Sequence, residues 1–365
     1  METPLFFVAD DPDFAEVPSL RRSNAHPFVA QEVNATRSHA GLFETGIYAR
    51  YEVSGPGAEK WLDHMLSSRL PAVGRIRLAP MLSPAGKLMG DLTVTRLADD
   101  RFWLVGSYFL QEWHLRWFRE HLPKTGVRIE NLSESWLGFS LSGPRSRDIL
   151  AALTGADVSN SALPFLSCQN MDIGMTQAVV ARISLTGEMG YEISVPAIQQ
   201  RSLWFALCKA GEPFGLRQIG VRALDSLRFE KGYGGWGTEF AQSYTPGMSG
   251  LDRFVAFEKG DFIGRDSAVR EQERGASQQL VLLEVDATDA DVAGYEPIWA
   301  NGQRVGFVTS GGYGHYVDMS LALAYLDREA VESEASLSVH IVGEERPAHV
   351  LSLPPYDPTG LNMRG

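Results

Sequence analysis

The chain carries one local pattern twice, and the spacing of the two copies is the strongest constraint on its fold. In each copy an alternating apolar segment ends in a Gly-Pro turn and is followed by apolar residues at helical spacing. Alternation predicts a strand, the i, i+3, i+4 pattern predicts a helix, and proline is favoured where a helix begins. The copies, centred on Gly55 and Gly143, are too far apart for a solenoid array. They therefore predict a diverged internal duplication that folds as two related halves.

Length and a change of pattern between Glu273 and Gln278 predict more than one domain. The chain has 365 residues, whereas a typical domain holds about 150. After this boundary, short apolar segments are separated by Gly, Asn and Asp, which is typical of an all-β barrel or sandwich. The strands expected there are Leu280–Val285, Pro297–Trp299, Gln303–Thr309, Leu321–Tyr325, Ser336–Ile341 and Pro347–Leu353. We predict an N-terminal arm over residues 1–23, an α+β domain over residues 24–273 and a β domain over residues 279–365.

Composition argues against several classes of protein. The formal net charge of −12 repels a phosphate backbone, so we expect no nucleic-acid partner. Cys168 and Cys208 lie outside any metal-binding pattern and the histidines are scattered, so we expect neither a disulfide scaffold nor a metal site. The first residues lack the basic start of a signal peptide, and no apolar run approaches the ~20 residues of a membrane span. We therefore expect a cytoplasmic protein without a membrane partner.

The first candidate functional residue is a carboxylate in an otherwise apolar segment. Asp91 follows a glycine-containing turn and is flanked by Leu88, Met89, Leu92 and Val94. Because successive side chains of a strand point to opposite faces, Asp91 can be a solvated edge residue. Alternatively, it is an acid fixed on a rigid strand beside a cleft, where it serves a proton or a cation. The residues alone leave both interpretations open.

A second candidate carboxylate follows another glycine-rich turn. The chain turns at Gly187 and Glu188 and resumes as a strand that carries Glu192 between Tyr191 and Ile193. Both acids can be solvated, one in the turn and the other on the polar face of a hairpin. A buried carboxylate at position 192 would instead need a partner with several N–H donors, such as the edge of a polar ring.

A charged helix is expected over Arg222–Glu230, and it ends at Gly232. Ion pairing within the helix is the simplest account of its charges. The glycines that follow would let the backbone approach a ligand closely. They do not form G-x-G-x-x-G after a strand, so a dinucleotide site is not expected.

These segments together resemble the folate-dependent aminomethyltransferase family, whose type member is the T-protein of the glycine cleavage system. The matching segments are Gly41–Thr45, Gly86–Thr95, Thr186–Ser194 and Asp225–Glu230. Other segments resemble the tetrahydrofolate-binding half of dimethylglycine and sarcosine dehydrogenases, namely Glu230–Glu239, Asp261–Gly264 and Glu296–Gly311. The resemblance extends from about Ala40 to Arg364.

The resemblance implies a fold, a cofactor and an activity. The fold is α+β, with two interleaved α+β lobes around a central opening and a C-terminal β-barrel domain, so that residues 24–273 form the folate-binding domain. The cofactor is tetrahydrofolate. The activity is a one-carbon transfer of a methylene or methyl group to tetrahydrofolate from a small methylated amine or a related donor.

The resemblance also assigns site residues. Asp91 falls on the family's catalytic acid, and it shares with Thr93 a strand whose counterparts line the folate site. Glu192 falls on the folate-binding glutamate and, with Ser194, would hold the donor edge of the pterin. Arg253 matches a folate contact of the dehydrogenases. Tyr356 lies near the place of a folate-contacting tyrosine at the C-terminal end.

Two positions depart from the type T-protein, and other activities stay open. Leu224 stands where that protein uses an arginine for folate, and Leu361 stands where it has the tyrosine. Nothing resembles the flavin domain of the dehydrogenases, which implies a free-standing transferase served by a separate flavoprotein. The alternatives are a non-catalytic folate-binding subunit of a flavin oxidase and a demethylase of sulfonium or ether donors. An iron–sulfur maintenance protein of the same fold is disfavoured, because its signature cysteine is replaced by Tyr233.

Overall fold

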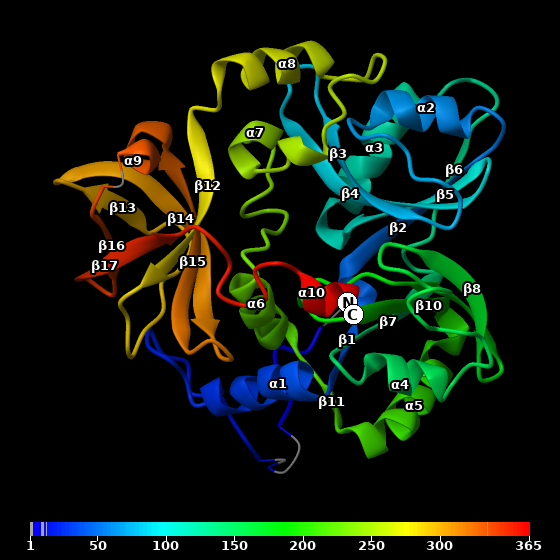
Figure 1. Ribbon diagram of the computed structural model, residues 1–365, viewed down its shortest axis with the longest axis horizontal. Helices are drawn as coiled ribbons and strands as arrows, with labels where there is room; N and C mark the ends of the chain where they lie inside the picture. Colours follow the sequence, from blue (N-terminus) through cyan, green and yellow to red (C-terminus); the bar gives the residue numbers. More distant parts are fainter. Residues whose placement is uncertain (1–2, 9–10, 12, 334) are drawn as a thin grey trace.

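Two open β-sheets and one closed barrel form the framework of the protein (Figure 1). The computed structural model describes residues 3–8, 11, 13–333 and 335–365. The six-stranded sheet has the order β11 (Leu216–Gln218), β1 (Ala40–Glu44), β7 (Trp136–Ser142), β10 (Gly190–Pro196), β9 (Thr176–Ala181) and β8 (Cys168–Ile173). The five-stranded sheet has the order β3 (Ile76–Leu82), β4 (Leu88–Ala98), β5 (Arg101–Ser107), β2 (Tyr48–Ser54) and β6 (Arg128–Asn131).

The two open sheets are interleaved along the chain. β1 lies in the six-stranded sheet, β2 to β6 build the five-stranded sheet, and the chain then returns to the first sheet with β7. The expected α+β fold with interleaved lobes is confirmed. Residues far apart in the sequence therefore meet where β1 leaves one sheet and β2 enters the other, through the short 3-10 turn η1 (Thr45–Ile47).

The two copies of the repeated pattern occupy equivalent places in the two sheets. β2 leads through Gly55 into helix α2 (Ala58–Met65), and β7 leads through Gly143 into helix α4 (Ser146–Ala151). The φ angles of Gly55 and Gly143 are 114° and 125°, a conformation that L side chains rarely adopt. A Cβ atom at Gly143 would also lie 2.6 Å from the carbonyl oxygen of His39. Glycine is required at both turns.

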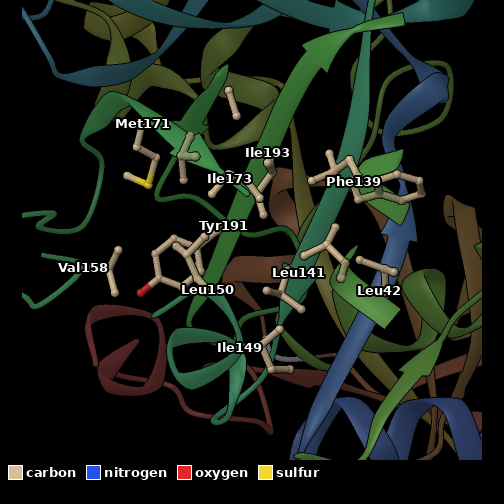
Figure 2. Packing of buried hydrophobic residues seen from close by; sticks show 14 of the residues in the cluster. Leu42, Phe139, Leu141, Ile149, Leu150, Val158, Met171, Ile173, Tyr191 and Ile193 are labelled. Atoms are coloured by element: carbon tan, nitrogen blue, oxygen red, sulfur yellow. The ribbon is translucent and has the colours of Figure 1, made fainter. Parts of the chain in front are cut away.

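Each sheet buries one face against its own helices. On the six-stranded sheet, Figure 2 shows Leu42, Leu141 and Ile193 packed with Ile149 and Leu150 of α4. The equivalent core of the five-stranded sheet contains apolar residues of α2 and of helix α3 (Gln111–His121), with the buried His114 beside them. Polar residues that alternate with these core residues must therefore face away from the helices.

The C-terminal barrel is closed by β12 (Gln278–Val285), β15 (Met319–Asp327), β14 (Gln303–Gly314), β13 (Pro297–Ala300), β16 (Leu337–Ile341) and β17 (Glu344–Leu351). Each strand expected from the sequence has its counterpart here, and the β-barrel is confirmed. One short helix, α9 (Arg328–Glu332), interrupts the strands and was not expected. Because the barrel is closed, each of these six strands is paired with a neighbour on both sides, and none of them is an edge strand.

The remaining helices pack between and around these sheets (Figure 1). They are α1 (His26–Ser38), α5 (Gln200–Gly211), α6 (Val221–Glu230), α7 (Pro246–Ser249), α8 (Arg265–Arg274) and α10 (Leu361–Arg364). Short 3-10 turns are η2 (Tyr108–Leu110), η3 (Ala197–Gln199), η4 (Glu212–Phe214) and η5 (Asp252–Phe254). Of the helices in the described ranges, none is both long enough and apolar enough to cross a membrane.

Candidate active site

Asp91 points away from the apolar core of its own sheet. On β4 its neighbours Leu92 and Val94 are fully buried among α2 and α3, whereas Asp91 and Thr93 are partly buried on the other face. The partner of Asp91 in the β-ladder is Pro80 of β3. Burial raises the pKa of Asp91 to about 7. Asp91 is thus neither a fully solvated edge residue nor a fully enclosed one.

Glu192 has the same relation to the six-stranded sheet. Tyr191 and Ile193 lie in the core beneath β10, and Glu192 is partly buried on the opposite face with Ser194. In the ladder Glu192 lies between Ser140 of β7 and Ala181 of β9. Burial raises the pKa of Glu192 to about 7, and the charge of Arg50 partly opposes this shift.

The first strand after the crossover brings the two acids together. Burial raises the pKa of the Tyr48 hydroxyl on β2, and the charges of Glu192 and Asp91 raise it further. Arg50 lowers it. Tyr48 therefore lies within electrostatic range of both acids, which come from different sheets, and we call Asp91, Glu192, Tyr48 and Arg50 together the junction site.

Arg50 supplies the positive charge of the junction site. Its side chain is only 2% exposed, and its guanidinium donates hydrogen bonds to the carbonyl oxygens of Tyr48 and Thr45 and to Thr45 Oγ1. In the part of the chain that the structure describes, it forms no ion pair within 4.0 Å. Burial lowers the pKa of Arg50, while Glu192 and Tyr48 raise it. Its field is the reason that Glu192 ionises more readily than its burial alone would permit.

The two acids have acceptor capacity that the protein does not use. Among the described residues, no other side chain or backbone N–H donates a hydrogen bond to the carboxylate of Asp91 or Glu192. Both side chains are partly buried, and none of their oxygens is an enclosed atom without a partner, so a ligand can reach them. A ligand edge that carries two adjacent N–H donors would satisfy one carboxylate completely. The arrangement fits a polar, donor-rich ring such as a pterin.

The other predicted site residues lie in two different settings. Thr93 and Ser194 share strand faces with Asp91 and Glu192, as expected. Arg253 is exposed on η5, where its guanidinium lies 5.0 Å from the centre of the Phe254 ring. No hydrogen bond or ion pair between described residues joins Arg253 to the junction site, and its role stays a prediction.

Tyr356 belongs to a buried ion network. Its hydroxyl donates a hydrogen bond to Glu188, and the Arg37 guanidinium lies 3.6 Å from its ring centre. Arg37 also binds Glu188 at 2.9 Å and Glu230 at 2.7 Å, and these three charged side chains are almost completely buried. The network ties α1, the turn before β10, α6 and the C-terminal segment together. Within the described residues nothing joins Tyr356 to the junction site directly.

The two departures from the T-protein pattern have different surroundings. Leu224 is buried in a small core between α1 and α6 with Val33 and Phe43. Leu361 begins α10 and is 65% exposed. Neither position offers a charged or polar group that could replace the arginine or the tyrosine of the type protein.

Sequence reasoning missed Tyr48 and Arg50. Their strand alternates polar and apolar residues, with Glu52 and Ser54 following Arg50 on the polar side, so the pattern alone did not mark Arg50 as the buried one. The crossover between sheets, which turns this strand toward the two acids, is not visible in the sequence. A separate cavity of about 280 Å³ lies elsewhere, between the N-terminal segment and α5. It includes neither acid, so it does not define the candidate site.

Comparisons with known proteins agree with this architecture. Residues 1–259 match the family model of the GCVT N-terminal domain, and residues 278–357 match that of the glycine cleavage T-protein C-terminal barrel domain. Mitochondrial dimethylglycine dehydrogenase of Mus musculus is 31% identical over 356 residues, which are 97% of this chain and 41% of that protein. The chain thus spans less than half of the length of this relative.

Other relatives match over nearly their whole length. An aminomethyltransferase of Saccharopolyspora erythraea is 31% identical over 346 residues, 94% of each chain. The crystal structure of the glycine cleavage system aminomethyltransferase T from Bartonella henselae superposes with a TM-score of 0.82 at 26% identity, covering 91% of this chain and 90% of that one. From the two family models, these relatives and the shared fold, the chain belongs to the glycine cleavage T-protein family of aminomethyltransferases.

Proposed function

We propose that this protein is a tetrahydrofolate-dependent one-carbon transferase that acts at the junction site on a small methylated amine. The observation that carries the proposal is the convergence of Asp91 and Glu192 from two sheets, each with unused acceptor capacity. Tetrahydrofolate, when bound, supplies the amine nitrogen that accepts the one-carbon unit. The relatives named aminomethyltransferase support this class of reaction.

Glu192 binds and orients the cofactor. An ionised carboxylate accepts two parallel hydrogen bonds from the adjacent N–H groups of a pterin edge. Arg50 favours the ionised form that this contact requires. Ser194 lies two residues along the same strand face and supplies a hydroxyl beside the ring. Because β10 is a central strand of its sheet, the carboxylate is held on a rigid element.

Asp91 moves a proton and stabilises positive charge. Its pKa of about 7 matches neutral pH, which is the condition under which an acid–base group transfers protons most effectively. In its ionised form it stabilises an iminium-like cation, and it then accepts the proton that the attacking amine releases. Tyr48 and Thr93 present hydroxyl groups to the same region.

The proposed donor is a methylated amine, and a separate flavoprotein is the proposed partner. The match to dimethylglycine dehydrogenase covers 41% of that relative, so the alignment leaves the larger part of it without a counterpart in this chain. An amine oxidised by such a partner would reach the junction site as a cation, which is the charge that Asp91 stabilises.

The test is a donor screen with tetrahydrofolate and the purified chain, with and without a flavin-dependent amine oxidase. Mass spectrometry distinguishes 5,10-methylene- from 5-methyl-tetrahydrofolate. A methylene product that depends on an oxidised amine supports the proposal. A methyl product formed from sulfonium or ether donors contradicts the proposal and indicates that the protein is a demethylase. Tight folate binding without any product indicates a non-catalytic subunit.

A further inference from the structure

β4 contains an irregularity immediately before Asp91. Met81 pairs with Gly90, but the next residue of β3, Leu82, pairs with Leu88, so Met89 is an extra residue on β4. Met89 packs in the same core as Leu92, although a regular strand would turn residues three apart to opposite faces. The β-bulge therefore resets the alternation of the strand just before the acid.

The bulge decides which way Asp91 points. A shift of one residue in a strand moves every side chain to the opposite face. Without the extra residue, the strand leaving the Gly86 turn would present Asp91 to the helices of the core and Leu92 to the junction site. Catalytic placement of Asp91 thus depends on the conformation of Met89 and Gly90.

One buried histidine fills the space beneath this bulge. His114 of α3 is 0% exposed, and its Nε2 lies 2.9 Å from the position that a Cβ atom at Gly90 would occupy. Its Cε1 lies 3.1 Å from the equivalent position at Gly106 of β5. Two glycines in neighbouring strands thus leave room for a single imidazole ring. Substitution of either glycine would displace the ring or the strand.

The orientation of the imidazole is fixed from the other side. The hydroxyl of Tyr51 lies 3.2 Å from Nδ1 of His114. Nε2 is buried and makes no hydrogen bond with any described residue, and the nearby Met89 backbone only partly opposes the effect of burial on the pKa of His114. Burial lowers the pKa of His114 to about 4, so the ring is neutral at physiological pH. The same hydroxyl also donates to the carbonyl oxygen of Gln111 at 3.3 Å, so the contacts fix the place of the ring rather than which nitrogen carries its proton.

We propose that His114 is a positioning residue that holds the bulge at Met89 and Gly90 and thereby aims Asp91 into the junction site. The inference rests on the proposed function at one point only, namely that a misplaced Asp91 lowers turnover. The histidine touches neither substrate nor cofactor and acts through the backbone of β4. A displacement of about 1 Å at a catalytic group is enough to lower a rate about 100-fold.

Variants of His114 separate this role from simple packing. His114→Leu fills the core but removes both nitrogens, whereas His114→Gln keeps a donor near the place of Nε2. We expect His114→Leu to lower kcat about 10- to 100-fold with the folate Kd changed less than about 3-fold, and His114→Gln to restore most of kcat. The matched control is Phe118→Leu, which removes volume from the same helix and core without touching Gly90.

The control decides between positioning and stability. Phe118→Leu should lower the melting temperature at least as much as His114→Leu while keeping kcat near the wild-type value. Wild-type turnover in His114→Leu, or equal loss of kcat in Phe118→Leu, overturns the inference.

A measurement independent of turnover completes the test. The side-chain carboxyl carbon of Asp91, assigned with Asp91→Asn, reports its titration by NMR. We expect it to titrate near the value of about 7 in the wild type and higher in His114→Leu, where the carboxyl turns toward the apolar helices. An unchanged titration overturns the inference even if the wild type proves to be inactive. An inactive wild type with a shifted titration refutes the proposed function alone.

Discussion

Asp91 and Glu192 lie on strands of different sheets, yet both carboxylates raise the pKa of the same hydroxyl, that of Tyr48. The pair therefore exists only when both interleaved lobes are folded and in contact. Each acid nevertheless has its own strand, its own neighbours and its own raised pKa. The two roles proposed for them can be separated by single substitutions.

Glu192→Gln should weaken folate binding more than any other substitution at the junction site. The amide keeps the shape but turns one acceptor oxygen into a donor that faces the donors of the pterin. We expect a loss of about 1.5–3 kcal/mol, the value of a hydrogen bond to a charged group. Isothermal calorimetry with tetrahydrofolate measures it, and Asp91→Asn is the control whose affinity should change little. Unchanged affinity in Glu192→Gln would remove the assignment.

Asp91→Asn should abolish most turnover while folate still binds. The variant loses both the charge and the basicity of the acid, so the rate should fall by about 10²–10⁴-fold. Asp99→Asn is a matched control, since Asp99 is exposed at the end of the same hairpin. Steady-state rates of the three proteins test the role, and normal turnover in Asp91→Asn contradicts it.

Removal of the charge at position 192 should stabilise the protein above neutral pH. With a pKa of about 7 in the fold against 4.5 in the unfolded chain, the folded protein binds more protons between these values. Stability contributed by this group is therefore lost as the pH rises from 4.5 to 7. We expect Glu192→Gln to be more stable by about 1–3 kcal/mol at pH 8 and equal to the wild type near pH 4.5. Denaturant unfolding at both pH values measures the difference, and equal stability at pH 8 would show that the acid is not buried.

Tyr356→Phe should lower stability and leave folate affinity within about two-fold of the wild type. Its hydroxyl is bound to Glu188 in the network around Arg37. Loss of one hydrogen bond to a charged group costs about 1.5–3 kcal/mol. Arg37→Met should cost about 3–5 kcal/mol, because it leaves Glu188 and Glu230 buried without their cation. A large loss of folate affinity in Tyr356→Phe would instead support the cofactor contact that the resemblance implies.

Local patterns predicted much of the fold, because they depend on neighbours in the chain. Alternating strands, Gly-Pro turns and the barrel strands after Gln278 are of this kind. Helix α1 was missed, since its buried positions include the charged residues Glu32 and Arg37, whose partners lie far along the sequence. The junction site was half predicted for the same reason. Asp91 and Glu192 were candidates from their local patterns, and the family resemblance supplied their expected roles, but the effect of Arg50 on Glu192 depends on the crossover between sheets.

Arg50 gives the last and most specific prediction, because its effect should depend on pH. Its charge lowers the pKa of Glu192, so Arg50→Met should raise that pKa above about 7. At pH 7 less of Glu192 is then ionised, and folate affinity should fall in proportion to the ionised fraction, by up to about tenfold. At pH 9 the carboxylate ionises in both proteins and the affinities should converge, while Arg50→Lys should resemble the wild type throughout.

Thr45→Val is the matched control, since it removes one hydrogen bond to the guanidinium but keeps the charge. Folate titrations at pH 6, 7, 8 and 9 distinguish an electrostatic role of Arg50 from a purely structural one. If the affinities of Arg50→Met and the wild type converge at high pH, Arg50 acts through its field on Glu192. A loss that is equal at every pH means that Arg50 only supports the backbone, and the electrostatic role is then wrong.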